Sequence, residues 1–146
     1  MKVLICTFGS TSHYACRLFY SLLHNIAEVE LFFFNGNWNE DTKGFVNEYI
    51  RSGKPDLIAV SLLTLELSLC KKFVAAVRRL CDSEKTKIIF GGPHTFLAPE
   101  DCLDVANFIC TGEGEYTLLG LCEQFNRVGR WSRVAFERIP NLTYCS

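Results

Sequence analysis

Apolar residues in this chain occur as short continuous runs that are separated by longer stretches with helical periodicity. Five runs stand out: Val3–Phe8, Val29–Phe34, Leu57–Leu63, Lys87–Phe90 and Phe108–Cys110. The runs do not alternate with polar residues, which is typical of strands covered on both faces, as in parallel sheets. The pattern therefore predicts a sheet of five parallel strands.

The stretches between the runs carry apolar residues at three- and four-residue spacing, as amphipathic helices do. The clearest examples lie at 15–26, 67–80 and 118–125, with a shorter one at 45–50. This alternation of strands and helices favours a three-layer α/β sandwich with right-handed crossovers. We predict a flavodoxin-like, Rossmann-like fold with strand order 2-1-3-4-5.

Three further observations concern the end of a helix, a short connection and the C-terminal segment. Gly53 follows the second helical stretch, where a C-cap is expected. The short segment between the fourth and fifth strands leaves room for one or two helical turns from Pro99. Ile139–Tyr144 is apolar enough for a last strand or a connector. We expect one domain over residues 1–130 and a connector over 131–146, and the chain looks cut at a domain edge.

Composition and charge exclude several classes of protein. The chain has 146 residues and a net charge of −1, from 15 basic and 16 acidic residues. A nucleic-acid partner is not expected, because such proteins usually carry a basic surplus. The longest apolar stretch, 57–70, is interrupted by polar residues and is shorter than the roughly 20 residues of a membrane span. With no secretory signal, the expected compartment is the cytoplasm.

The eight cysteines do not form a metal-binding pattern. They stand at 6, 16, 70, 81, 102, 110, 122 and 145, with no C-x-x-C pair. Zinc-ribbon and iron–sulfur spacings are therefore absent. In a reducing compartment we expect free thiols that pack as small hydrophobic residues.

Ligands of such sheets bind at the carboxyl ends of the strands. The loops expected there cover residues 9–13, 63–66, 91–96 and 111–115, and they hold glycines, small hydroxyl residues, two histidines and almost no cations. They lack the acidic cluster of a phosphoacceptor receiver and the G-x-G-x-x-G of a nicotinamide site. Gly9, Ser10, Thr11 and Ser12 could hold a flavin phosphate through backbone N–H groups, which leaves a flavin-binding module as one alternative.

Three motifs at these loops resemble those of a known protein family. Ser61-Leu62-Leu63-Thr64 ends the third strand, Gly91-Gly92-Pro93-His94 ends the fourth, and Gly112-Glu113-Gly114-Glu115 follows the fifth. In this order they resemble the cobalamin-binding domain at the N-terminus of cobalamin-dependent radical SAM proteins. The resemblance covers about residues 2–144.

The resemblance implies cobalamin as cofactor and the loop residues as its binding site. The predicted cofactor-binding residues are Gly9, Ser10, Thr11, Ser12, His13, Ser61, Leu62, Leu63, Thr64, Gly91, Gly92, Pro93, His94, Gly112, Glu113 and Gly114. The radical SAM barrel, S-adenosylmethionine and a 4Fe–4S cluster would belong to the rest of a parent enzyme that transfers methyl groups or performs related chemistry. This chain alone is not expected to catalyse a reaction. The other alternative is a degenerate domain that binds no cobalamin and acts as a docking scaffold.

The residues themselves make the cofactor plausible. Cobalamin needs a broad surface over the sheet and a slot for its nucleotide tail. Small residues at Ser61, Gly91 and Gly92 would leave that slot open, and the hydroxyls of Ser61 and Thr64 can bond to tail or corrin amides. His94 would either face the corrin rim or cap the turn.

His13 is the candidate axial ligand of cobalt. Classical cobalamin modules carry Asp-x-His-x-x-Gly after the first strand, and an ungapped match puts His13 at the ligand position. Thr11 then replaces the aspartate and Cys16 replaces the glycine. A metal-bound imidazole normally donates its other N–H to an acceptor, and a threonine is a poorer acceptor than a carboxylate. Our prediction is therefore that His13 does not ligate cobalt.

Overall fold

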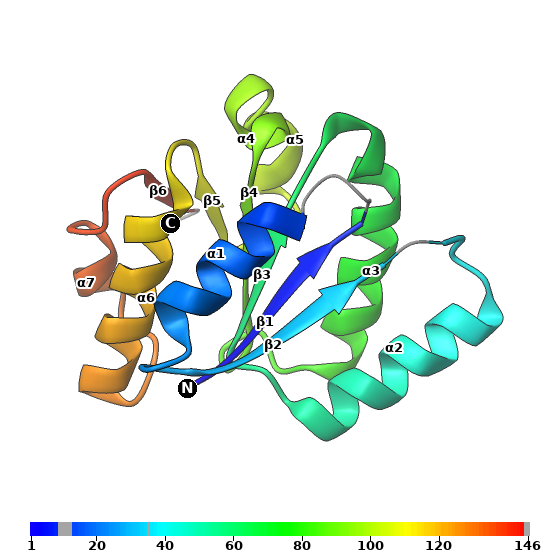
Figure 1. Ribbon diagram of the computed structural model, residues 1–146, viewed down its shortest axis with the longest axis horizontal. Coiled ribbons are helices and arrows are strands. Elements are labelled where there is room, and N and C mark those ends of the chain that lie inside the picture. Colours follow the sequence, from blue (N-terminus) through cyan, green and yellow to red (C-terminus); the bar gives the residue numbers. More distant parts are fainter. Residues whose placement is uncertain (9–12, 35, 145–146) are drawn as a thin grey trace.

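A six-stranded sheet with helices on both faces forms the molecule (Figure 1). The computed structural model describes residues 1–8, 13–34 and 36–144. The strand order is β2-β1-β3-β4-β5-β6. The strands are β1 (Lys2–Thr7), β2 (Glu28–Phe33), β3 (Leu57–Ser61), β4 (Lys87–Gly91), β5 (Phe108–Cys110) and β6 (Leu142–Tyr144). β1 to β5 pair in parallel, which confirms the predicted fold and the order 2-1-3-4-5.

Side chains of neighbouring strand positions point to opposite faces of the sheet. Val3 and Ile5 lie in one buried core, and Leu4 and Cys6 lie in the other. Both faces of β1 are therefore buried, which explains why the first apolar run is continuous rather than alternating.

The helices divide between these two cores. Those of the described residues are α1 (His13–Leu23), α2 (Glu40–Gly53), α3 (Leu67–Leu80), α4 (Pro93–Leu97), α5 (Glu100–Leu103), α6 (Gly114–Val128) and α7 (Arg133–Phe136), with a 3₁₀ turn η2 (Thr64–Glu66). Buried residues of α1, α6 and α7 pack on the face of Ile5, whereas those of α2, α3 and α5 pack on the face of Cys6. None of the described helices is long and apolar enough to cross a membrane.

β6 is the main difference from the predicted sheet. It pairs antiparallel to β5, with Leu142 opposite Cys110 and Tyr144 opposite Phe108. Ile139–Tyr144 thus contributes a sixth strand, one more than the five that we predicted. Upstream of this strand, the rings of Trp131 and Phe136 pack against Phe108 with centroid distances of 5.9 and 4.9 Å. Residues between 131 and 144 are therefore part of the packed core.

Two local predictions have different outcomes. The short helix predicted from Pro99 is confirmed as α5, which Pro99 precedes, whereas the additional helix α4, which begins at Pro93, was not predicted. At the end of α2, Gly53 is still helical, and the left-handed cap conformation falls on Lys54, with φ of 45°. The backbone N–H of Lys54 donates to the carbonyl of Ile50, so a lysine here takes the place that glycine usually fills.

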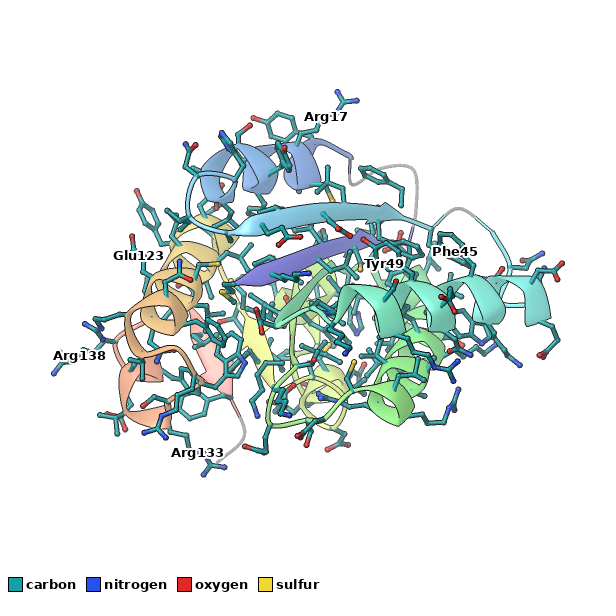
Figure 2. The ribbon with its side chains drawn as sticks, turned by 90° about the horizontal axis from the view of Figure 1, so that it is seen from below. Arg17, Phe45, Tyr49, Glu123, Arg133 and Arg138 are labelled. Atoms are coloured by element: carbon teal, nitrogen blue, oxygen red, sulfur yellow. The ribbon has the colours of Figure 1, made fainter. Side chains whose placement is uncertain are left out.

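β2 forms one edge of the sheet and is only partly covered. Glu28, Glu30 and Phe33 are exposed, whereas Val29 and Leu31 are half-buried. Aromatic rings of α2 cover part of this strand, and Figure 2 shows Phe45 and Tyr49 on that helix. The ring centroid of Tyr49 lies 6.0 Å from that of Phe32, and its hydroxyl donates to the Glu30 carboxylate.

Candidate functional site

A cavity of about 300 Å³ lies between α1, α6 and the carboxyl-terminal half of the sheet. Its apolar wall includes Ile5, Ala15, Leu18, Phe19, Ala59, Ile89 and Leu118. The predicted site residues that line it are Ser61, Gly91, Gly92, Pro93, Gly112, Glu113 and Gly114. The structure thus brings together, on one side of the sheet, residues from three loops that are far apart in the sequence.

The sheet register explains why the cavity is open at this level. The register pairs Thr7 of β1 with Ser61 of β3, and Ser61 in turn with Gly91 of β4. They share the face on which Ile5 and Ala59 are buried, and they are all small. The Oγ1 atom of Thr7 is fully buried, with no hydrogen-bond partner among the described residues. A polar atom in that situation is uncommon, since most buried polar groups are paired.

Gly91 and Gly92 play different structural roles. A Cβ on Gly91 would meet only the Cβ of Cys110, at an ordinary contact distance of 3.7 Å. Gly92 has φ of +98°, and a Cβ there would lie 2.9 Å from both the backbone nitrogen and the oxygen of Leu62. The backbone itself therefore demands glycine at position 92, whereas the glycine at position 91 serves only to leave space.

The connection after β3 turns away from the cavity. Leu62 is completely buried in the core of the opposite face, and its backbone bonds to Gly91 and His94. The Glu66 carboxylate accepts a hydrogen bond of 3.0 Å from the backbone N–H of Leu63 and holds the turn. Thr64 is exposed at this edge of the sheet. Of the predicted Ser61–Thr64 motif, only Ser61 lines the cavity.

His94 is buried beneath this edge rather than displayed on it, with 2% of its surface exposed. Its Nδ1 atom lies 3.1 Å from the Oγ1 atom of Thr64. Its Nε2 atom lies 3.7 Å from Oδ2 of Asp101, a residue that the sequence analysis did not single out. The structure therefore places His94 as a link between α4, η2 and α5, which is neither of the two roles expected from the sequence.

The loop after β5 closes one end of the cavity. The Cys110 thiol donates to the carbonyl oxygen of Gly112, at 3.4 Å, and also contacts the Thr117 hydroxyl. A Cβ on Gly114 would approach the ring of Phe19 to 3.0 Å. Close packing of α6 against α1 thus favours glycine at position 114, whatever ligand the cavity takes.

The remaining predicted residues precede α1 or begin it. Gly9, Ser10, Thr11 and Ser12 lie outside the described residues. His13 is the first residue of α1, and its role toward cobalt stays a prediction. Within the described part of the chain, no group of three or more His, Cys, Asp or Glu side chains could hold a metal ion.

Burial raises the pKa of several cysteine thiols. It raises the pKa of Cys16 to about 11 and that of Cys122 to about 12. The pKa values of Cys6 and Cys70 are also raised, mainly because burial disfavours the thiolate. All seven cysteines of the described segments are free thiols. Cys6, Cys16, Cys70 and Cys122 are therefore packing residues rather than nucleophiles.

A larger hollow of about 530 Å³ lies between α6 and the segment of α7. Its lining includes Gln124 and Ile139 and none of the strand-end loops. Ligands of parallel α/β sheets bind at the carboxyl ends of the strands, so we assign the functional site to the smaller cavity.

Comparisons with a family model and with solved structures both give matches for this chain. The family model described as "B12 binding domain" matches residues 21–121. Among solved structures, the cobalamin-dependent S-adenosylmethionine radical enzyme OxsB with aqua-cobalamin bound has a TM-score of 0.77 and 16% identity. OxsB with both aqua-cobalamin and S-adenosylmethionine bound has a TM-score of 0.76 and 16% identity, and apo OxsB has the same values.

The coverage of these matches is uneven. The alignments span 99% of this chain but only 20–21% of the OxsB chain, so this chain corresponds to about one fifth of that enzyme's length. The catalytic barrel is not in this chain. No curated protein matches. Because the family model spans more than half of its residues, the chain belongs to the B12-binding domain family, as its loop motifs predict.

Proposed function

We propose that this domain binds cobalamin with the nucleotide tail in the cavity between α1 and α6 and the corrin over the carboxyl edge of the sheet. The observation that carries the proposal is the cavity itself, which is apolar, opens at the ligand-binding edge and is kept free of side chains at Gly91. Its volume of about 300 Å³ suits the flat base of the tail and is too small for the corrin.

The polar groups of the cavity suit the same ligand. The Ser61 hydroxyl lines the cavity, and the orphaned Thr7 hydroxyl stands beside it in the sheet register. A nitrogenous base or a ribose in the cavity would give the Ser61 hydroxyl a hydrogen-bond partner.

When bound, cobalamin supplies a cobalt centre that can carry a methyl group. The residues of this chain would hold and orient the cofactor, while catalysis would belong to a radical SAM barrel in the rest of a longer polypeptide. Residues 131–146 would lead toward that barrel as well as complete the core. S-adenosylmethionine and a 4Fe–4S cluster would bind in the barrel, and the proposed compartment is the cytoplasm.

Reconstitution with a choice of cofactors tests this proposal. The purified domain is incubated separately with hydroxocobalamin and with flavin mononucleotide, desalted and scanned for absorbance. We expect a stoichiometric cobalamin spectrum and no retained flavin. Retention of flavin alone would support the flavodoxin-like alternative, and retention of neither would support the docking scaffold; both results would contradict the proposal.

The variant Gly91→Val localises the bound cofactor. Its side chain would occupy the cavity and should reduce cobalamin retention at least tenfold, because the tail could no longer enter. Gly36→Val is a matched control, since a Cβ at Gly36 meets no atom within 4 Å and the residue does not line the cavity. Equal retention by both variants would show that the tail binds elsewhere.

A further inference from the structure

His94 joins three elements at the edge where the ligand would bind. It belongs to α4, its Nδ1 atom lies 3.1 Å from the Thr64 hydroxyl of η2, and its Nε2 atom lies 3.7 Å from the Asp101 carboxylate of α5. The imidazole is buried, and Nε2 has no hydrogen-bond partner within the described chain. Asp101 and Thr64 are both exposed, so a buried ring connects two side chains at the surface.

The two neighbours determine which ring nitrogen carries the proton. A neutral imidazole has one N–H group and one bare nitrogen. The Asp101 carboxylate can only accept, and its negative charge favours the N–H on the nitrogen that faces it, which is Nε2. Nδ1 is then a bare acceptor, and the 3.1 Å contact requires the Thr64 hydroxyl to donate its proton to Nδ1.

We infer that Asp101 and His94 fix the direction of the Thr64 hydroxyl proton, so that Thr64 presents only an acceptor oxygen to the ligand. The matching group on the ligand is a primary amide N–H, and the rim of the corrin in cobalamin carries several primary amides. This inference rests on the proposed function. Thr64 is the residue that contacts the ligand, and His94 and Asp101 are positioning residues that act through it.

The tautomer can be measured without any cofactor. Long-range proton–nitrogen NMR correlation of the free domain distinguishes a protonated Nε2 from a protonated Nδ1, and loss of signals in His94→Asn assigns them among the three histidines. We expect the Nε2–H form in the wild type and a larger share of the Nδ1–H form in Asp101→Ala. A wild-type ring protonated on Nδ1 would overturn the inference. Glu100→Ala, which removes the neighbouring exposed carboxylate of α5, should leave the tautomer unchanged.

Measurements of hydroxocobalamin affinity test whether Thr64 contacts the ligand. Thr64→Val keeps the size of the side chain and removes the oxygen, and it should weaken hydroxocobalamin binding about tenfold, whereas Thr64→Ser should rescue it. Asp101→Ala should weaken binding about threefold, because the Thr64 proton is released to turn outward, and Glu100→Ala should not change it. Wild-type affinity in a folded Thr64→Val domain would overturn the inference.

The failures of the two proposals are distinguishable. If the wild-type domain retains no cobalamin, the proposed function fails, whatever the tautomer of His94. If it retains cobalamin and Asp101→Ala shifts neither the tautomer nor the affinity, the inference about Thr64 fails alone. Near-UV circular dichroism of each variant verifies that the fold is intact.

Discussion

Gly92 faces Leu62 so closely that a Cβ at position 92 would lie 2.9 Å from two backbone atoms of that residue. The contact joins the end of β4 to the start of the β3–α3 connection, where the carbonyl of Leu62 also accepts the backbone N–H of His94. The adjacent glycine, Gly91, has no such contact. The two glycines of one motif can therefore be separated experimentally.

Gly92→Val should destabilise the protein, whereas Gly91→Val should not. With φ of +98° and ψ of −178°, Gly92 lies in a region that essentially only glycine adopts, and the steric overlap adds to this strain. We expect Gly92→Val to lower the free energy of unfolding by at least about 3 kcal/mol in urea titrations. Equal midpoints for the two variants would show that the backbone at position 92 relaxes freely.

His13→Ala should bind cobalamin with a nearly unchanged absorbance spectrum. The reason is chemical: Thr11 stands where classical modules have the aspartate that orients the ligating ring. The exposed His24, on the same helix, provides the control substitution His24→Ala. A clear spectral shift in His13→Ala that is absent from His24→Ala would identify His13 as the lower axial ligand of cobalt.

The buried thiols should make the fold sensitive to alkaline pH. Burial raises the pKa of Cys122 to about 12, whereas a thiol in the unfolded chain ionises near about 8.5. Above the lower value the unfolded chain releases a proton that the folded chain keeps, so stability falls as pH rises, by about 1.4 kcal/mol per unit for each such thiol.

Urea unfolding between about pH 7 and about pH 10 measures this slope. Cys122→Ala removes one buried thiol, so its stability should fall less steeply than that of the wild type. Identical slopes for the two proteins would contradict the assignment. Mass spectrometry with and without reductant checks the accompanying prediction that the chain holds neither an essential disulfide nor a structural metal.

Phe136→Ala tests how far the domain extends. The Phe136 ring is buried and lies edge-on to Phe108 at 4.9 Å and to Tyr144 at 5.4 Å. Truncation of a buried phenylalanine typically costs about 3–5 kcal/mol, and we expect that loss in urea unfolding. Phe96→Ala, at an exposed position, serves as the control. Wild-type stability of Phe136→Ala would mean that residues 131–146 are a connector outside the domain.

The parallel part of the fold could be predicted from the sequence because a strand that is buried on both faces is apolar along its whole length. β1 is a continuous apolar run for that reason. β6 has only three residues and depends on pairing with β5, so its apolar sequence was compatible with either a strand or a connector. α4 was missed, because Gly91-Gly92-Pro93 reads as a turn while Pro93 in fact begins a helix.

The candidate site was partly predictable for a similar reason. Glycines and a serine at strand ends mark where a ligand can enter, and Ser61 and Gly91 indeed line the cavity. The burial of His94 was not predictable, because the sequence does not reveal in which direction a side chain after a turn points. No sequence pattern indicated the contact of Asp101 with His94, since an acidic residue near a helix start usually faces solvent.

The antiparallel β6 has a consequence for self-association. It covers the outer edge of β5, so among the described strands the long parallel edge that no further strand covers is β2. Glu28 and Glu30 stand on that edge, and a second copy of the strand would bring like charges together. The two glutamates thus act as a barrier to strand-to-strand aggregation, and their replacement by valine would create an apolar edge able to recruit another chain.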